Sequence, residues 1–479
     1  MKRRPLVEEI STPFSAAEVF GHFHHEPFAF FLDSGMDPAK LGRYSFIGFD
    51  PFLVLKSRGN DITLLSTGCQ ERRKGNPFRV LGELLDRHNL DPGGAPTPLV
   101  GGAVGYLSYD LCHFIENVPS KAIDDLQLPE CCLGFYDVVI TFDHLQQKTY
   151  IASGGFPEQD EGRRLLRARE RLEQVKARIA DTRPRLPDQC APPPGNPVGA
   201  MPQSNFTHRE YLRAVETVRE YIISGEIYQV NLSQRFEGRL TTHPYDLYQR
   251  LRTINPAPFA AYLNLDDVTV ISASPERFLK LDGRRVETRP MKGTRPRGRS
   301  VSEDAALAAE LQDSIKDRAE NVMIVDLERN DLGKVCHVGT VNVSELCTLE
   351  EYATVFQLTS CVQGRLASGK DRIDLLEACF PGGSITGAPK IRAMEIIDEL
   401  EPTRRSIYTG SIGYLSFSGQ MDLNIVIRTI VVKNQRVYLQ VGGGIVYDSE
   451  PEIEYQETLH KAKALFQALN LSPHVAAEV

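Results

Sequence analysis

Short apolar runs, interrupted by glycine and proline, alternate with polar residues through most of residues 1–182. Runs of this length that are rich in β-branched and aromatic side chains predict strands. The tract at 163–180 differs, because its apolar residues recur at helical spacing among Arg and Glu, which predicts a helix with a solvated face. The predicted strands cover 28–32, 44–47, 52–55, 99–107, 133–142 and 149–151.

The pattern after residue 204 mixes both kinds of element. At 207–224 apolar residues form one helical stripe, Thr207 can cap the first turn and Glu210 completes a capping box, so this segment predicts a helix. Further strands are predicted at 227–236, 259–265, 268–273, 278–281, 407–416, 421–432 and 436–441, and further helices at 303–325, 372–378, 389–400 and 451–469.

The order of these elements indicates a fold class. Several strands follow one another with only a turn between them, as at 432–436, and such strands pair antiparallel. Runs of strands interleaved with runs of helices are typical of α+β folds. No G-x-G-x-x-G follows a predicted strand, so a Rossmann fold has no support.

A proline-rich segment divides the chain. Residues 183–203 carry almost no apolar periodicity, which predicts a linker or an irregular surface crossing. This segment separates a β-rich N-terminal region, 1–182, from a C-terminal region, 204–475.

Composition limits the partners. The 479-residue chain has a net charge of −8 and a pI near 5.9, which argues against nucleic acid as a ligand. Lys2 and Arg3 resemble the start of a signal peptide, but Glu8 and Glu9 follow where an apolar stretch would be needed. No apolar run approaches the ~18 residues of a membrane span. We therefore expect a cytoplasmic protein with no membrane contact.

The cysteines predict no metal site. All nine are scattered without a C-x-x-C pair, which favours reduced thiols over a disulfide framework or a zinc site. Cys112, Cys361 and Cys379 stand among apolar residues, so we expect them in the core.

The segment 290–295 carries candidate nucleophilic chemistry. Lys292 stands between a proline and a glycine, with Arg289, Arg295 and Arg297 close in sequence. Nearby positive charge lowers the pKa of a lysine, and a neutral amine is a nucleophile whereas an ammonium ion is not. The segment therefore predicts a loop with a reactive lysine; a solvated basic loop is the alternative.

The last predicted helix, 451–469, has a distinctive start. Ser449 is its predicted N-cap, and Glu454, Glu457 and Lys461 share one face. Such a face is either part of a site or an exposed stripe of ion pairs.

A second acidic pair, Asp317 and Glu320, lies three residues apart in the predicted helix 303–325. Carboxylates on two converging helices form a hard-oxygen site, which suits Mg²⁺ because this ion needs few protein ligands and keeps its waters. We therefore predict Mg²⁺ as the cofactor, held by this pair together with Glu454 and Glu457.

Two glycine-rich segments and one arginine suit an anionic ligand. Residues 442–444 are three glycines between a predicted strand and a helix, where backbone amides can approach an anion; a plain turn is the alternative. The segment 380–390 opens a helix and can hold a carboxylate, but it lacks the Walker spacing of an ATP site. Arg428, inside the predicted strand 421–432, needs a partner, either a substrate carboxylate or an internal acid.

Six stretches match one known family in the right order and span nearly the whole chain: 42–48, 224–235, 274–278, 320–331, 381–390 and 448–461. On these motifs the sequence resembles the chorismate-utilising enzymes. The resemblance implies an anthranilate synthase component I-like fold, in which large antiparallel β-sheets pack as a sandwich with helices on the outside. It also implies that 204–475 is the chorismate-binding catalytic domain.

Two positions distinguish branches of this family. Isochorismate and salicylate synthases carry a lysine base where this chain has Gln229, so the resemblance points to the ammonia-using branch. Within that branch, anthranilate synthase component I typically reads P-I-A-G-T, and aminodeoxychorismate synthase component I typically reads P-I-K-G-T. Lys292 therefore resembles the second pattern; Met291 in place of Ile conserves volume.

The resemblance implies roles for individual residues. Glu320 and Glu457 are the implied Mg²⁺ ligands, with the other two carboxylates acting directly or through water. Lys292 attacks C2 of chorismate as the C4 hydroxyl leaves, with Glu276 as candidate general acid. Ammonia then adds at C4 and displaces the lysine. The implied substrate-binding residues are Gln229, Thr294, Ser384, Arg428, Gly442, Gly443, Gly444 and Lys461.

The resemblance also implies partners. The N-terminal region is similar to the part of the family that binds tryptophan, and its L-L-E-S motif is present as F-L-D-S, which makes Asp33 and Ser34 candidate tryptophan-binding residues. No glutaminase-like segment accompanies the chain, so a separate glutamine amidotransferase subunit is expected to deliver ammonia.

One departure and two alternatives accompany this expectation. Gln357 replaces the histidine of the family segment V-x-H-L-V-S, and an amide cannot act as an acid or base near neutral pH, so no proton transfer is assigned there. Anthranilate synthase component I, which eliminates pyruvate, is the nearer alternative. A non-catalytic tryptophan-binding regulatory subunit is the other; both acidic pairs and Lys292 argue against it.

Overall fold

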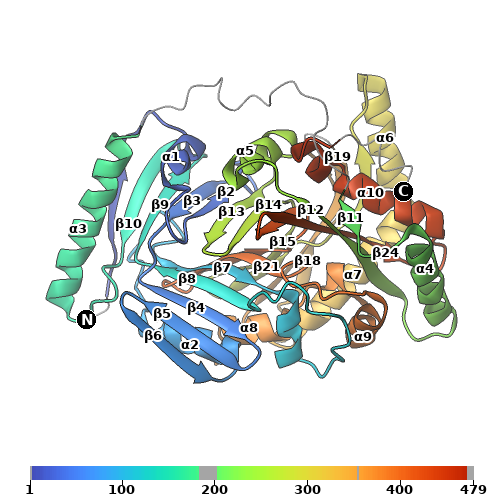
Figure 1. The fold of residues 1–479 in the computed structure, drawn as a ribbon, viewed down its shortest axis with the longest axis horizontal. Coiled ribbons are helices and arrows are strands. Elements are labelled where there is room, and N and C mark those ends of the chain that lie inside the picture. Colours follow the sequence, from blue (N-terminus) through green and yellow to red (C-terminus); the bar gives the residue numbers. More distant parts are fainter. Residues whose placement is uncertain (1–2, 183–201, 353–354, 472–479) are drawn as a thin grey trace.

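The computed structural model describes residues 3–182, 202–352 and 355–471. Within these ranges, two twelve-stranded antiparallel sheets form the body of the protein (Figure 1). The first sheet runs in the order β1 (Leu6–Ile10), β10 (Lys148–Ser153), β9 (Val138–Asp143), β3 (Tyr44–Gly48), β2 (Phe30–Asp33), β13 (Phe259–Leu265), β14 (Val268–Ser274), β23 (Thr429–Lys433), β24 (Arg436–Ile445), β12 (Gln229–Arg239) and β11 (Gln203–Ser204), with β20 (Gly387–Ala388) also on β12.

The second sheet faces the first. Its order is β17 (Met291–Pro296), β19 (Val355–Arg365), β16 (Arg285–Thr288), β15 (Arg277–Asp282), β22 (Met421–Asn424), β21 (Ser411–Ser416), β7 (Gly102–Leu107), β8 (Cys131–Tyr136), β4 (Leu53–Arg58), β5 (Asp61–Ser66) and β6 (Cys69–Lys74), with β18 (Asn342–Glu351) also on β19.

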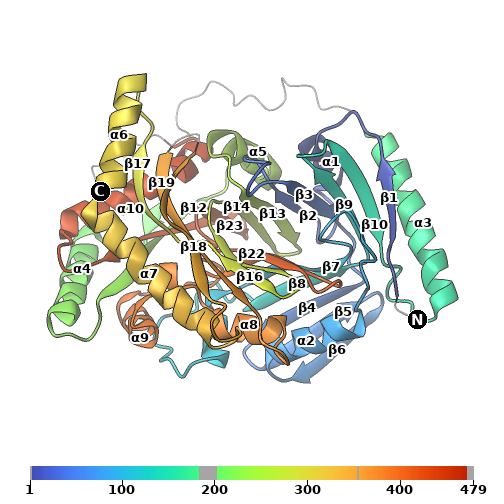
Figure 2. The same cartoon turned by 180° about the vertical axis from the view of Figure 1, so that it is seen from behind.

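Helices cover the outer faces of both sheets (Figures 1 and 2). Their bounds are α1 (Ala16–Phe23), α2 (Pro77–Arg87), α3 (Glu161–Ala180), α4 (His208–Ile223), α5 (Pro244–Ile254), α6 (Val301–Asp313), α7 (Ile315–Gly333), α8 (Arg372–Cys379), α9 (Lys390–Leu400) and α10 (Pro451–Ala468), with 3-10 turns η1 (Tyr109–Phe114) and η3 (Gly383–Ile385). The predicted sandwich with helices outside is thereby confirmed, as is the Thr207–Glu210 capping box of α4.

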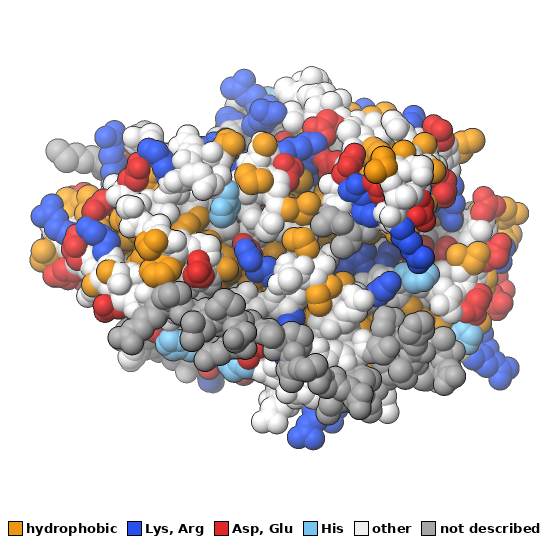
Figure 3. Space-filling view, turned by 90° about the horizontal axis from the view of Figure 1, so that it is seen from above, with side chains coloured by type: hydrophobic (Ala, Val, Ile, Leu, Met, Phe, Trp, Pro, Cys, Tyr) orange, Lys and Arg blue, Asp and Glu red, His pale blue; other side chains and the backbone are white. Residues whose placement is uncertain are grey.

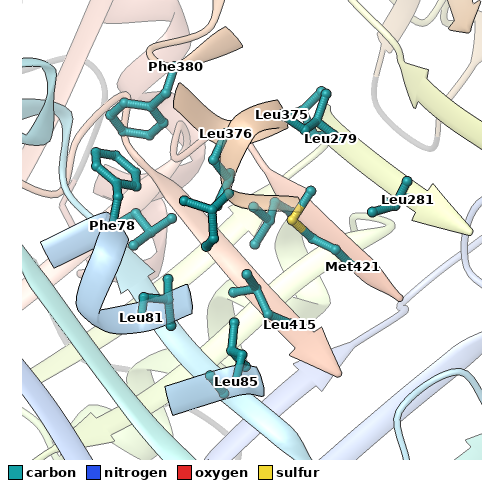
Figure 4. Close-up of a cluster of buried hydrophobic side chains, with 14 of the residues drawn as sticks. Phe78, Leu81, Leu85, Leu279, Leu281, Leu375, Leu376, Phe380, Leu415 and Met421 are labelled. Atoms are coloured by element: carbon teal, nitrogen blue, oxygen red, sulfur yellow. The ribbon is translucent and has the colours of Figure 1, made fainter. Parts of the chain in front are cut away.

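Three apolar layers hold this arrangement together. Between the sheets, Phe46 and Val270 of the first sheet share one cluster with Val104 and Tyr414 of the second. On the outer face of the first sheet, α1, α3, α5 and α10 bury their apolar faces. On the outer face of the second sheet, α2 and α8 pack over β15, β21 and β22, as Figure 4 shows. Apolar burial of this extent is the main stabilising contribution to such a fold.

The N- and C-terminal regions share both sheets. Strand β2 pairs with β13, and β7 pairs with β21, so each sheet takes strands from both sides of the proline-rich segment. That segment, predicted at 183–203, lies outside the described residues except for Pro202 and Gln203. It divides the sequence but not the two sheets.

Two predicted strands were wrong in the same way. The apolar run 133–142 is two strands, β8 in the second sheet and β9 in the first, and the run 421–432 likewise divides into β22 and β23. Asp137 marks the first crossing; it is 1% exposed and lies 3.5 Å from Arg171 Nε. Because each half is buried on both faces, apolar continuity alone cannot reveal such a crossing.

The predicted helix 303–325 was also wrong, since it divides at Ser314 into α6 and α7. Ser314 has an extended backbone, and its hydroxyl accepts a hydrogen bond from the backbone N–H of Asp317. Asp317 and Glu320 therefore occupy the first two turns of α7, not the interior of one long helix.

The three cysteines predicted to be buried, Cys112, Cys361 and Cys379, lie in the core. No described helix is both long and apolar enough to cross a membrane. On the face seen in Figure 3, Lys and Arg side chains are interspersed with Asp and Glu, so no extended surface of one sign covers it.

Candidate active site

Lys292 lies on a strand, which corrects the loop expected from the sequence. It belongs to β17, beside β19 and against α6 and α7 (Figure 2), and the pairing of β17 with β19 shifts between Lys292 and Thr294. The residue between them, Gly293, has a φ of +77°, and a Cβ there would lie 2.9 Å from Asp317 Cβ. Glycine therefore permits the bulge that lets α7 approach the lysine.

The arginines near Lys292 in sequence are engaged elsewhere. Arg289 pairs with Glu350, Arg295 with Glu310, and Arg297 with Asp304. Burial lowers the pKa of Lys292, with a contribution from the positive charge of Lys461, while Glu320, Glu276 and Glu457 oppose the shift. The predicted direction is thus supported, but its assigned cause was wrong.

The three glycines at 442–444 form part of a strand, so the alternative of a plain turn before the last helix is wrong. They are the end of β24 and pair with β12, Gly443 lying opposite Leu232. On the other edge, β23 pairs with β24 no further than Leu439. The glycine segment therefore has a strand neighbour on one edge, and α10 packs against it.

Side chains of the site leave no room for a Cβ at these positions. A Cβ at Gly444 would lie 2.1 Å from Gln229 Nε2 and 3.3 Å from Lys292 Nζ. One at Gly443 would lie 3.3 Å from Glu454 Oε2, 3.5 Å from Glu457 Oε1 and 3.7 Å from Lys461 Nζ. The lysine from one sheet and the acidic face of α10 thus meet at the glycine strand of the other sheet.

On α10, Lys461 is the centre of a polar group. Its Nζ lies 2.5 Å from Glu457 Oε1 and donates to the Gly442 carbonyl oxygen at 2.8 Å. The Lys461 charge holds the pKa of Glu457 below its usual range. The shared face predicted for Glu454, Glu457 and Lys461 is confirmed.

Ser449 does not cap α10, contrary to prediction. Glu450 occupies the cap position, and the Ser449 hydroxyl instead donates to Glu454 Oε1 at 2.6 Å. Burial raises the pKa of Glu454, whose Oε2 is buried and has no hydrogen-bond partner in the described part of the chain. Ser449 therefore fixes one carboxylate oxygen and leaves the other directed at the glycine strand.

The two members of the second acidic pair, Asp317 and Glu320, have different surroundings. Glu320 lies close enough to Lys292 and Glu457 for their charges to act on it, and burial raises its pKa. Asp317 instead forms an ion pair with Arg295, at 3.2 Å. Glu320 is thus the member of the pair that faces the site.

This donor set fits Mg²⁺. Among residues 3–182, 202–352 and 355–471, no group of three or more His, Cys, Asp or Glu side chains is close enough to hold a metal by itself. Mg²⁺ needs only one or two carboxylates, because it completes an octahedral shell with waters and substrate oxygens. Glu320 and Glu457 are the two carboxylates here that could hold it.

Glu276 is the buried acid of the site. It is 5% exposed, and burial raises its pKa from 4.5 to about 7, against the opposing effects of Ser384 and Lys292. The Ser384 hydroxyl is buried beside this carboxyl, and its interaction with Glu276 favours the charged form. A carboxyl with this pKa can hold and release a proton near neutral pH, as a general acid must.

Two predicted substrate-binding residues lie in unexpected surroundings. Arg428 is in the connection between β22 and β23, at a φ of +53°, rather than inside a strand. Burial lowers the pKa of its guanidinium, which hydrogen-bonds the Lys461 carbonyl oxygen. Thr294 is exposed near the end of β17. Neither placement assigns a ligand, so their roles stay predictions.

Gln357 occupies β19 opposite Thr294. It is 8% exposed, and its Oε1 accepts no hydrogen bond from the residues described. Gln229, at 1% exposed, likewise has a buried Oε1 without a partner in those ranges. Acceptors of this kind are costly when unpaired, so they are typical of ligand sites.

A cavity lies between the two sheets, apart from Lys292. It has a volume of about 460 Å³ and is lined by Asp33 and Ser34, with Phe46, Phe259 and Tyr414 among its aromatic walls. The structure therefore places the two residues predicted for tryptophan at one cavity.

Sequence reasoning missed several buried polar groups beside the site. Glu328 on α7 is 7% exposed, accepts a hydrogen bond from Thr288, and has a pKa raised by burial to about 8. Arg405 and Glu401 form an ion pair of which both members are 3% exposed. No helical periodicity marks Glu401 and Arg405, because α9 ends at Leu400 and both residues lie beyond it.

Comparison with known proteins shows the family of this chain. The family model for chorismate binding enzymes matches residues 25–467, so the chain belongs to that family. More closely, it is an enzyme of the anthranilate and aminodeoxychorismate synthase group within it.

Relatives of both kinds are equally similar. Aminodeoxychorismate synthase component 1 of Bacillus subtilis (strain 168) is 39% identical over 437 residues, covering 91% of each chain. Anthranilate synthase component 1 of Thermus thermophilus is 40% identical over 476 residues, covering 98% of each. The crystal structure of anthranilate synthase component I from Streptococcus pneumoniae TIGR4 superposes with a TM-score of 0.76 at 32% identity, covering 89% of this chain and 92% of that one.

Proposed function

We propose that the protein aminates chorismate at C4 to give 4-amino-4-deoxychorismate, as aminodeoxychorismate synthase component I. The observation that carries the proposal is Lys292, whose Nζ lies at the glycine strand beside Gln229 and whose pKa burial lowers. A lysine that loses its proton more readily than usual supplies a nucleophile at this position.

Lys292 and Glu276 have separate roles in the steps of the proposed reaction. Lys292 Nζ forms a bond to C2, the ring double bond shifts, and the C4 hydroxyl takes a proton from Glu276 and leaves as water. Ammonia then bonds to C4, the double bond shifts back, and the lysine nitrogen leaves. The Glu276 carboxylate takes up the proton that the added nitrogen loses. Water is the product that balances the uptake of ammonia.

Glu320 and Glu457 would hold Mg²⁺, with Glu454 acting directly or through water. When bound, this ion would neutralise the ring carboxylate and stabilise charge on the departing hydroxyl. Arg428, Ser384 and the amides of the glycine strand would bind the remaining polar groups of chorismate.

The ammonia would come from a separate glutamine amidotransferase subunit. Both relatives are named component 1, which supports a partner subunit for those proteins. The product would then serve p-aminobenzoate and folate synthesis.

The identity of the product tests the reaction. The purified protein is incubated with chorismate, Mg²⁺ and ammonium at mildly alkaline pH, and products are identified by mass spectrometry alongside a pyruvate assay. We expect an aminated product that keeps its enolpyruvyl group, with no pyruvate. Anthranilate with stoichiometric pyruvate would establish the alternative reaction, and the absence of any chorismate turnover would favour a non-catalytic regulatory subunit.

The metal assignment has its own test. Glu457→Gln removes a ligand charge, so the Mg²⁺ concentration that gives half-maximal rate should rise about tenfold or more. Glu452→Gln, on the same helix but paired with His208, is the matched control and should leave that concentration unchanged. An unaltered metal requirement in Glu457→Gln would remove this residue from the metal site.

Tryptophan in the cavity at Asp33 and Ser34 is a second proposal. The cavity volume of about 460 Å³ and its aromatic walls support a ligand with an aromatic ring. Calorimetry with tryptophan, and with phenylalanine as control, measures it. Heat of binding for tryptophan alone would support the proposal; no binding at millimolar concentration would refute it.

A further inference from the structure

The segment 380–389, which carries Ser384, is held through its carbonyl groups. Arg405 Nη1 donates to the Ile385 carbonyl oxygen at 2.8 Å, and Lys390 Nζ donates to those of Cys379 and Pro381 at 2.9 and 2.8 Å. The Thr386 hydroxyl donates to the Gly382 carbonyl oxygen at 2.9 Å. Four backbone carbonyl groups near Ser384 thus accept hydrogen bonds from the side chains of Arg405, Lys390 and Thr386.

Each of the two cations has a buried counter-ion. Arg405 Nε and Nη2 donate to the two oxygens of Glu401 at 2.9 and 2.7 Å, which is a bidentate pair. Lys390 Nζ lies 2.5 Å from Asp331 Oδ2, and these side chains are 11% and 6% exposed. Neither charge is left to be satisfied by a ligand.

The Glu401–Arg405 pair also fixes the strand that carries Gln229. Arg405 Nη2 donates to the Asn231 carbonyl oxygen at 2.6 Å. Glu401 Oε1 accepts from the backbone N–H and the hydroxyl of Ser233, at 2.9 and 2.7 Å. One ion pair therefore joins the Ser384 segment to β12. Glu276 lies beside Ser384, and Lys292 lies beside Gln229 of β12.

We propose that Arg405 and Lys390, each with its carboxylate, are positioning residues that hold the Ser384 segment at a fixed distance from β12 and so set the affinity for chorismate. The inference rests on the proposed binding of chorismate at this site. A displacement of about 1 Å in a positioning element can cost about a hundredfold in rate, so a rigid support has a functional reason.

Stability alone does not account for the Glu401–Arg405 pair. Replacing a complete buried ion pair by uncharged residues of similar volume is often neutral or stabilising, whereas removing one partner is strongly destabilising. The pair supplies directed hydrogen bonds to two segments, the Ser384 segment and β12, which an apolar pair cannot do.

The test uses the full chain and a double variant that removes both charges, Glu401→Gln with Arg405→Met. Glutamine keeps an acceptor for Ser233, and methionine keeps volume, so we expect the variant to fold with a Tm close to native. We expect its Kd for chorismate, by calorimetry with Mg²⁺, and its KM to rise at least about tenfold. Arg392→Met with Glu226→Gln, a more exposed ion pair between α9 and the connection after α4, is the control and should leave both values unchanged.

A second measurement separates positioning from general weakening of the fold. If the ion pair acts through Ser384, then Ser384→Ala should weaken chorismate binding in the native background and add little in the double variant. A folded double variant with native Kd and KM, or fully additive effects, would overturn the inference. Because calorimetry needs no turnover, a protein that binds chorismate but does not aminate it would refute the proposed reaction and still test the positioning role.

Discussion

The Lys292 site and the Asp33 cavity use buried polar groups in opposite ways. At the Lys292 site, Glu454 Oε2 and Gln229 Oε1 are buried without a hydrogen-bond partner in the described ranges. At the cavity, Asp33 accepts from Tyr248 and Ser45 and pairs with Arg252, and Ser34 donates to two carbonyl oxygens.

Three cationic side chains that line the cavity also have ion-pair partners. Arg43 pairs with Asp143, Lys40 with Glu345 and Glu350, and Arg277 with Asp422 and Glu287. Unpaired buried polar atoms cost free energy that a ligand can recover, whereas paired ones have nothing further to gain. The comparison therefore predicts that substitutions at the Lys292 site mainly affect chemistry, and those at the cavity mainly affect stability.

The largest effect is expected for Lys292→Ala. Loss of the nucleophile should lower chorismate turnover at least about a thousandfold, while the midpoint of thermal unfolding changes little, because the side chain forms no hydrogen bond in the described structure. Lys280→Ala, at the wall of the cavity, is the control and should keep native turnover. Native turnover in Lys292→Ala would exclude the lysine as nucleophile.

Glu276→Gln should reduce kcat by about a hundredfold or more, since the general acid is lost. In the native protein, Glu276 with a pKa of about 7 is protonated below that pH, so the rate should fall as pH rises above 7. The variant should lack this alkaline limb. A pH–rate profile measured over the stability range checks both points, and an unchanged alkaline limb would assign it to another group.

The two regions should also differ in how pH affects stability. Folding raises the pKa of Glu276 from 4.5 to about 7, so the folded protein binds this proton more tightly than the unfolded chain. This proton contributes on the order of 3 kcal/mol to the free energy of unfolding. The contribution is fully present below about pH 4.5 and is lost as pH rises to about 7. At the cavity, burial alone would raise the pKa of Asp143, but the Arg43 hydrogen bonds hold it below its usual range. The contribution of ionised Asp143 to the free energy of unfolding is therefore present above the ordinary pKa of an aspartate and is lost as pH falls below it.

Urea unfolding at a series of pH values measures this difference. Glu276→Gln should remove the decrease between about pH 4.5 and 7, and Asp143→Asn should remove the loss at low pH. A native profile that is flat across the first interval would contradict the buried, protonated state of Glu276.

The smallest and most direct comparison is between two serines. Ser384→Ala removes a hydroxyl that lies beside the Glu276 carboxyl, so the free energy of unfolding should change less than in Ser34→Ala, while KM for chorismate rises. Ser34→Ala removes a hydroxyl that donates to the Tyr44 carbonyl oxygen at 2.7 Å and should cost about 1 kcal/mol, with KM unchanged. If both variants lost stability equally, the contrast between the two regions would fail.

Much of the fold could be predicted from local patterns, because capping boxes and short alternating strands are properties of neighbouring residues. The α4 capping box and the shared face of Glu454 and Lys461 belong to this class. Crossings between sheets do not, since the apolar run through Asp137 looks the same whether or not the chain changes sheets.

The sequence suggested which residues to examine, but it did not reveal the surroundings of their side chains. Family motifs led to Lys292 and Glu276, but not to the fact that burial, rather than arginines close in sequence, lowers the lysine pKa. The predicted strand 436–441 stopped short of the three glycines, and only the tertiary structure brings Gln229 and Lys292 against Gly444. The Glu401–Arg405 pair left no local signal at all.

The sharing of both sheets by the two halves of the chain has a consequence for how the protein forms. Asp33 pairs in register with Ala260, and Gly102 with Ser416, so neighbouring strands are separated by hundreds of residues along the chain. Contact order is therefore high, and folding should be slow, with apolar strands exposed until the last segments arrive. Neither half is an autonomous folding unit, and a ribosome must release nearly the whole polypeptide before either sheet can close.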